Sequence, residues 1–439
     1  MSEKMSLRYF LSLRKFSSTH SLLRPTLSSD YKSRELWEER FNCKFLTDVQ
    51  AIKTINSKIA AKDTLNELEV DTFINVAAPR RDEIDQLRES VDILKRFRRS
   101  IRAHLLLPST QHGICRLFID SGRLSSLINL IEQRVDYGIF PDPFILNMCF
   151  DDALEQENLS LASRLAAHIM LQEDFGENHI SDVFSLYSVA RYTESKPDFD
   201  QWRNPTVDSD PIFMPDVSQD AQSVSKTSQA DDEEEEEDQY IRIPFLRNPY
   251  NDQHFDLTSP RVICGKTMSM ISRQFSSNPE LFHQLRLLGS ILQGKWQESV
   301  SISRECVQSK IVAGNTKDLA KFFLTNLNGL TEPSDSERET LNMNIDKLNS
   351  DGKPLSDHAE AMTTDFRSIE TRDINQLKSD LVQWSKRRHA IRKAEDEWAA
   401  RERIIEEIRR KKDEIKRRED YLYFYDNLKK RSLGRLEYD

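Results

Sequence analysis

The stretch from Leu355 to Leu433 contains neither glycine nor proline, and this constrains the fold more than any other feature of the sequence. Glycine and proline are the residues that most readily interrupt a helix, so one continuous helix is expected here. The 58 residues from Asp373 to Lys430 would form a helix about 87 Å long, at about 1.5 Å per residue. Such a helix is too long for one globular core, so it must lie along a partner or project from the body.

Apolar residues recur along this helix at heptad spacing, which predicts a partial coiled coil. One series is Leu377, Trp384, Ile391, Trp398 and Ile405, and a second has Ala394, Ile408, Ile415 and Leu422. Arg387 and Arg401 interrupt the seam.

The densest basic segment of the helix offers phosphate contacts to RNA, which position a protein without reading sequence. The alternative is a solvated, salt-bridged helix face. The candidate residues are Arg409, Arg410, Lys411, Lys412, Lys416, Arg417 and Arg418.

A second basic cluster lies between residues 95 and 102, where a predicted helix ends. Phe97 sits among its cations and can stack or face the core. On a helix end these cations could meet phosphate, although a solvated face explains them equally well. The candidate RNA contacts are Lys95, Arg96, Arg98, Arg99 and Arg102.

Helical segments separated by short breaks dominate the remaining chain, so we expect an all-α protein. The net charge is −10, but eight of those charges lie in the run Asp231 to Asp238. The other parts are close to neutral, so the charge does not exclude an RNA partner.

Five widely spaced cysteines indicate buried thiols in a reducing compartment.

The first residues are rich in Arg, Ser and Leu, and no acid occurs between Glu3 and Asp30. This is typical of a mitochondrial transit peptide, the alternative being a disordered basic tail. No apolar run is long enough to span a bilayer.

From these composition changes we expect six parts along the chain: 1–29, transit peptide and N-terminal tail; 30–193, helical repeats; 194–240, acidic disordered linker; 241–330, second helical region; 331–356, polar linker; and 357–439, long charged helix.

Two helix pairs align at a spacing of thirty-five residues, with Pro108 over Pro143 and the turn at Gly122 over that at Glu157. A period of this size with two helices per unit indicates an α-solenoid, although an ordinary bundle can give the same spacing. The segment YGIFPD, from Tyr137 to Asp142, would join the units.

The segment from Gly122 to Phe175 resembles a pair of pentatricopeptide repeats. It has GRL at 122–124, GIFPD at 138–142 and then Asn147, in the order of the repeat pattern. More narrowly, VDYGIFPDPFILN and LQEDF resemble the family of the mitochondrial small-subunit ribosomal protein numbered twenty-seven. That family also joins such repeats to a transit peptide, an acidic middle and a long C-terminal helix.

The resemblance implies an α-solenoid of pentatricopeptide-like helix pairs followed by a long C-terminal helix. In long repeats of this type, an early residue of the first helix and the last residue of the repeat select a base. Here these would be His112 with Asp142, and Asn147 with Glu177. Two clear repeats are too few to select a sequence, so we expect the repeats mainly to form a packing platform.

No catalytic, cofactor or metal site is predicted. Cys264-Gly265-Lys266-Thr267 ends like a phosphate loop, but the glycine that this loop needs five residues earlier is Pro260. A helix start is the better interpretation. His112 and Cys115 could share a helix face, but no second pair of metal ligands lies nearby.

The leading hypothesis is a non-catalytic, RNA-binding subunit of the mitochondrial small ribosomal subunit in the matrix. Its expected partners are small-subunit rRNA, neighbouring ribosomal proteins and tRNA, with no small-molecule substrate. The alternatives are a free mitochondrial factor that binds transcripts or tRNA, and an enzyme, which no motif supports.

Overall fold

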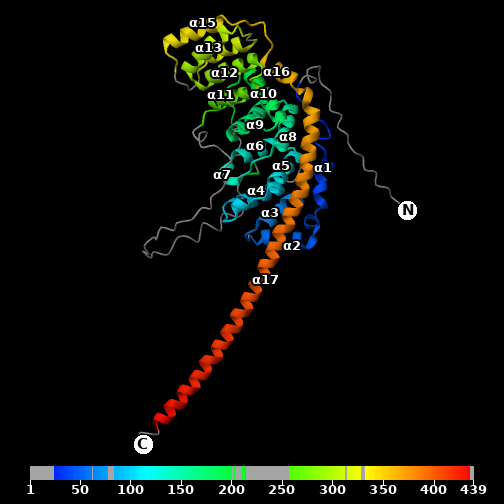
Figure 1. Ribbon diagram of the computed structural model, residues 1–439, viewed down its shortest axis with the longest axis vertical. Coiled ribbons are helices and arrows are strands. Elements are labelled where there is room, and N and C mark those ends of the chain that lie inside the picture. Colours follow the sequence, from blue (N-terminus) through cyan, green and yellow to red (C-terminus); the bar gives the residue numbers. More distant parts are fainter. Residues whose placement is uncertain are drawn as a thin grey trace, which may run out of the picture.

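The computed structural model describes residues 24–61, 63–77, 84–199, 202, 210, 212–213, 257–311, 314–327 and 332–435. Within these ranges the protein is all-α, as predicted, and contains helices and turns but no β-sheet (Figure 1). The acid run and most of the expected transit peptide lie outside the described residues.

The helices fall into three groups along the chain. The first comprises α1 (Arg34–Glu38), α2 (Val49–Ala60), α3 (Glu67–Val76), α4 (Ile84–Arg98), α5 (Pro108–Asp120), α6 (Leu124–Glu132), α7 (Arg134–Tyr137), α8 (Pro143–Glu155), α9 (Leu159–Gln172) and α10 (His179–Glu194). The second comprises α11 (Pro260–Ile271), α12 (Pro279–Gln293), α13 (Trp296–Gln308), α14 (Thr316–Thr325) and α15 (Asp335–Asp346). The last comprises α16 (Leu355–Ala361) and α17 (Phe366–Arg435).

The backbone confirms the alignment of the two repeat units. Gly122 and Glu157 both adopt a left-handed conformation, with φ values of 69° and 55°. Gly138 and Glu173 do the same at 66° and 61°. Each pair is thirty-five residues apart, so the same left-handed turns recur in both units. Left-handed residues end helices by turning the chain sharply, which is how each unit returns to stack on the preceding one.

The second helical region continues the stack, with α11 packed closely on α12 (Figure 1). Gly265 lies inside α11, where an added Cβ would come within 2.8 Å of the carbonyl oxygen of Gly289 in α12. Pro260 is the first residue of α11. The segment that ends like a phosphate loop is therefore a helix, as predicted, and its glycine serves close helix packing.

Two expected linkers differ from what the sequence indicated. The segment 331–356 contains α15, which begins with a reciprocal capping box between Ser334 and Glu337. After α10, the described side chains of Phe199, Trp202 and Ile212 are buried in the core. The polar composition of 331–356 did not reveal the helix that begins after Ser334. The polar composition after α10 did not reveal that Phe199, Trp202 and Ile212 are buried.

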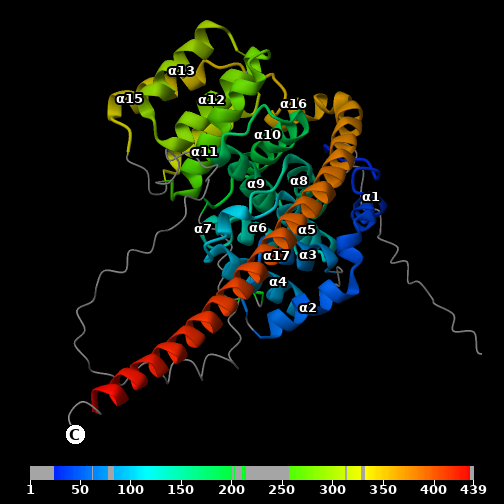
Figure 2. The same cartoon turned by 60° about the horizontal axis from the view of Figure 1, so that its bottom comes forward.

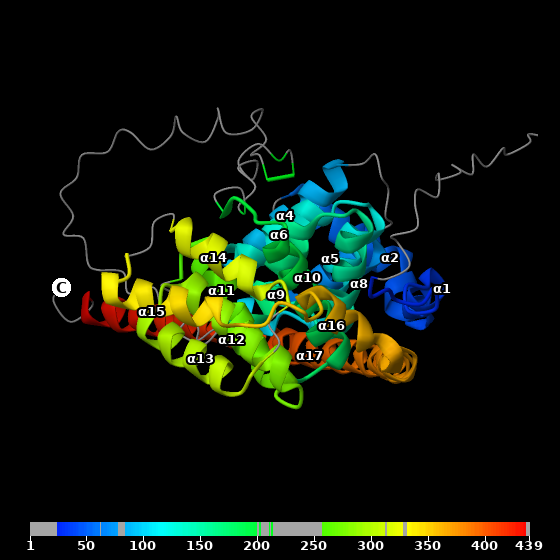
Figure 3. The same ribbon diagram turned by 90° about the horizontal axis from the view of Figure 1, so that it is seen from above.

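Helix α17 runs for 70 residues, and its first part lies across the solenoid against α3, α5 and α10 (Figure 2). Viewed from above, it stays along one side of the stack (Figure 3). Leu377 and Leu381 are buried in this contact. The red C-terminal part then projects beyond α2 (Figure 1). The predicted long helix is thus partly packed on its own chain and partly exposed.

A buried ion pair fixes α17 on the solenoid. Arg388 Nε donates to Asp71 Oδ2 at 2.6 Å, and both side chains are almost fully buried. The Asp71 carboxylate also accepts hydrogen bonds from the hydroxyl groups of Ser109 and Thr110. A buried charge is tolerated only when it is paired and hydrogen-bonded, so this contact permits one register of α17.

We predict that Arg388→Met lowers the free energy of unfolding by about 3–5 kcal/mol, because it leaves the Asp71 carboxylate buried without its cation. The double variant Asp71→Asn with Arg388→Met should recover part of this loss. Urea denaturation measures both effects.

The matched control is Arg418→Met in the same helix, where the pair with Glu414 is exposed. This control should change the free energy of unfolding by less than about 1 kcal/mol. Equal effects of the two single variants would show that the buried pair does not hold α17.

Candidate nucleic-acid interface

The basic cluster at 95–102 lies in the last turn of α4 and the turn that follows it. Phe97 is buried, so it packs inward and does not stack on a partner. Arg96 pairs with Asp92 at 2.9 Å. Lys95 and Arg99 make no ion pair within the described part of the chain, so they are the cations of this cluster that remain available.

Arg98 supports the joint between the two repeats. Its Nε donates to the carbonyl oxygen of Val135 at 3.2 Å. Its guanidinium lies over Gly138, where an added Cβ would come within 2.8 Å of Nη1. Burial lowers the pKa of Arg98. The side chain is therefore partly committed to the turn in YGIFPD, and is less free to meet phosphate.

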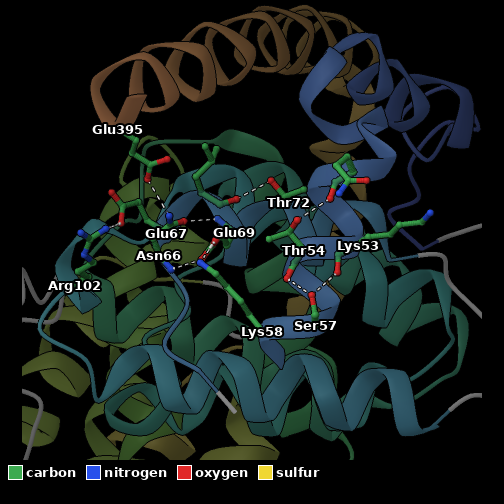
Figure 4. Close-up of polar contacts among 12 residues, drawn as sticks. Lys53, Thr54, Ser57, Lys58, Asn66, Glu67, Glu69, Thr72, Arg102 and Glu395 are labelled. Atoms are coloured by element: carbon green, nitrogen blue, oxygen red, sulfur yellow. Dashed lines mark hydrogen bonds and ion pairs between the residues drawn. The ribbon is translucent and has the colours of Figure 1, made fainter. Parts of the chain in front are cut away.

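Arg102 belongs to a polar network at the start of α3, beneath α17 (Figure 4). Its Nη1 pairs with Glu67 Oε2 at 3.2 Å. The neighbouring Asn66 donates to Glu395 Oε1 of α17 at 3.0 Å. Burial and the nearby carboxylate of Glu67 raise the pKa of Glu395. Arg102 thus neutralises part of an acidic cluster where α17 leaves the solenoid.

The first proposed base-reading pair is in contact, but it is enclosed by the protein itself. His112 Nδ1 lies 2.7 Å from Asp142 Oδ2, and the His112 side chain is buried. Its ring packs against Trp37 and against Trp384 of α17, with centroid distances of 4.9 and 5.3 Å. Burial opposes ionisation of Asp142, but His112 and the backbone N–H of Ile145 hold its pKa below the ordinary value.

The second proposed pair is displaced by one residue. The Nδ2 of Asn147 faces Asn178 Oδ1 at 3.5 Å, whereas Glu177 is exposed. Asn178 is the N-cap of α10, as Asp142 is the N-cap of α8. The connector from the left-handed Glu173 to Asn178 is one residue longer than the connector from the left-handed Gly138 to Asp142. The thirty-five-residue alignment is therefore shifted by one residue after this connector. The structure thus places Asn178, and not Glu177, beside Asn147.

Asn147 is also enclosed. Its Nδ2 donates to the Tyr31 hydroxyl at 3.2 Å, and its Oδ1 accepts from Ser181 at 2.7 Å. Tyr31 stacks on Phe144 with a centroid distance of 4.1 Å. The N-terminal segment and α17 therefore cover the face of the repeats on which base-reading side chains would lie.

The distal part of α17 is exposed and carries the second basic cluster. Lys411 pairs with Glu407 and Arg418 with Glu414, each one helical turn away. In the described chain, no ion pair is formed by Arg409, Arg410, Lys412, Lys416 or Arg417. These five cations can therefore meet an external anion.

Sequence reasoning missed two features of α17. The Arg388–Asp71 pair joins residues 317 positions apart, and no local pattern reveals it. An exposed aromatic segment also follows the basic cluster: Tyr421, Tyr423, Phe424 and Tyr425. Its signal was visible, because several large aromatic residues close together on an exposed helix mark an interaction surface.

The chain matches a known protein family. The family model described as mitochondrial 28S ribosomal protein S27 matches residues 1–414.

Three further observations describe the chain itself. Among the described residues, no helix is long and apolar enough to cross a membrane, and no cluster of His, Cys, Asp or Glu is suited to hold a metal ion. All five cysteines are free and buried, as predicted.

The contact of Arg98 with the repeat joint can be tested with two alanine substitutions. Gly138→Ala should destabilise the protein more than Gly122→Ala. Both glycines have positive φ, which costs an L-residue about 1–2 kcal/mol. An added Cβ meets the Arg98 guanidinium at 138, but nothing within 4 Å at 122. Equal losses of unfolding free energy in urea denaturation would mean that Arg98 does not support the turn.

Proposed function

Because the chain belongs to the mitochondrial 28S ribosomal protein S27 family, and so is a component of the small subunit of the mitochondrial ribosome, we propose that it acts there as a non-catalytic, RNA-binding scaffold. In this role the solenoid presents a basic helix end, and α17 extends from the solenoid towards neighbouring components. The proposal rests chiefly on one observation: at two separate places on the surface, cations form no ion pair within the described part of the chain.

The first place is the end of α4. Arg96, Arg98 and Arg102 have partners within the chain, which leaves Lys95 and Arg99 for phosphate. Arg99 is exposed and Lys95 is half-buried. Two cations on one helix turn suit adjacent phosphates of an RNA backbone, since phosphate contacts require charge and reach but no base readout.

The second place is the exposed part of α17. Five of its seven candidate cations are unpaired within the described chain, and the whole segment from Arg401 to Tyr425 is exposed. A rigid helix keeps such charges at fixed spacing, so they can follow a phosphate backbone without ordering a loop. The helix would thus contact rRNA at a distance from the solenoid.

The repeats themselves serve as a packing platform in this proposal. His112 and Asn147 are buried beneath Trp37, Tyr31 and α17. A base would have to displace α17 and break the Arg388–Asp71 pair before reaching them. We therefore assign sequence-independent RNA binding to the protein, and no base recognition to its repeats.

Replacing both Lys95 and Arg99 by alanine should weaken binding to small-subunit rRNA and reduce its salt dependence. Each cation that neutralises a phosphate contributes about 0.7–0.9 to the slope of log K against log salt, so removing two lowers the slope by about 1.4–1.8. Filter binding across a KCl series measures the slope.

The matched control is Arg34→Ala with Arg372→Ala, which removes two exposed cations that have partners within the chain. This control should leave the slope unchanged. The same slope for both double variants would remove the α4 cluster from the RNA interface.

A free RNA-metabolism factor is distinguished by sedimentation of mitochondrial lysate. The tagged chain should comigrate with the small subunit and remain there in moderate salt. Recovery only in light fractions would contradict a scaffold role.

A further inference from the structure

A line of aliphatic side chains follows the exposed part of α17. It consists of Ile404, Ile408, Ile415 and Leu422, whose exposed fractions are 58, 58, 57 and 63%. We call this line the distal stripe. Its last three members are seven residues apart, which is the spacing of a coiled-coil seam. A row of large aliphatic residues left in water is a binding surface that lacks its partner.

The distal stripe faces away from the solenoid side of α17. Arg388 points into the solenoid, and Ile408, Ile415 and Leu422 follow it by 20, 27 and 34 residues. At about 100° per residue, these positions are rotated by roughly 200°, 180° and 160° from Arg388. The stripe is therefore not an extension of the contact that holds α17, and it needs a separate partner.

The charge of the residues around the distal stripe indicates the sign of the charge that the partner should have. Between residues 401 and 422, the half of α17 centred on the stripe has four cations and two acids, a surplus of two positive charges. The cations are Arg401, Lys411, Lys412 and Arg418, and the acids are Glu407 and Glu419. Residues beside a coiled-coil seam choose the partner by opposite charge.

We propose that the distal stripe binds an amphipathic helix of another protein, with heptad-spaced apolar residues flanked by acidic side chains. A second copy of this chain would bring the same cations against one another, which costs free energy. RNA can meet the cations, but isoleucine and leucine have no ring face on which a base can stack. A helix can bury the stripe and pair with its flanks at the same time.

This inference deepens the proposed scaffold function, on which it rests, by naming the partner's chemistry. It assigns Lys412 to the protein partner and leaves the RNA contacts to the cations in the other half of α17, which are Arg409, Arg410, Lys416 and Arg417. Arg403, Arg410 and Arg417 are also seven residues apart, and they are rotated by only about 20–60° from the direction of Arg388. One helix thus presents an apolar seam on one side and an arginine row on the other.

Photo-crosslinking in mitochondria tests the proposal with the full chain. A photoreactive residue replaces Ile415 in one variant and, as the matched control, Asp413 on the opposite side in another. Crosslinks from position 415 should reach a helical segment of another protein with heptad-spaced apolar residues and acidic flanks, and crosslinks from 413 should not reach that segment. Crosslinks from 415 to rRNA, to a second copy, to a segment without that pattern, or to nothing would overturn the proposal.

Charge reversal provides the second arm. Lys411→Glu, Lys412→Glu and Arg418→Glu together should reduce the yield of the 415 crosslink at least tenfold. Arg34→Glu, Lys53→Glu and Arg372→Glu introduce the same number of acids at exposed positions outside the distal stripe and should leave it unchanged. Equal effects of the two triple variants would contradict recognition by the flanks. Sedimentation of the same samples reports ribosome membership separately, so failure of the scaffold function is distinguished from failure of this contact.

Discussion

The ion pair between Arg388 of α17 and Asp71 of α3 determines how the C-terminal helix lies on the first helices of the solenoid. The two residues are 317 positions apart, and their almost fully buried side chains meet at 2.6 Å. Such a pair adds little stability compared with an apolar contact of similar volume, but an unpaired charge in the same place is costly. Its physical effect is therefore to select one register of α17 on the solenoid.

That register has consequences on both sides of the pair. Before Arg388, Trp384 lies on His112 and the buried Leu377 and Leu381 face the repeats. Beyond Glu395, which accepts a hydrogen bond from Asn66, the helix leaves the solenoid and its apolar residues are exposed (Figure 4). The same helix thus closes the face where related repeats would read bases and extends a rigid arm. Its two halves perform different tasks because only one is packed on its own chain.

The parts that sequence predicted correctly depend on local patterns. The thirty-five-residue spacing and the long helix follow from glycine positions and from the absence of helix breakers. The structure confirms both. Long-range contacts were beyond prediction, because nothing near Arg388 identifies Asp71, and the basic clusters did not reveal which cations have partners within the chain. The contact of Asn147 with Asn178 was not predicted, because a connector of variable length precedes Asn178, although Asn178 is a recognisable helix cap.

The division of α17 into a docked half and a projecting half is tested most directly by hydrogen–deuterium exchange, in the free chain and in the assembled small subunit. In the free chain, amides from 377 to 395 should be protected as strongly as those of α3, and amides from 401 to 425 should exchange much faster. In the small subunit, the second group should become protected while the first remains unchanged. Uniform exchange along α17 in the free chain, or a distal half that stays unprotected in the small subunit, would contradict this account.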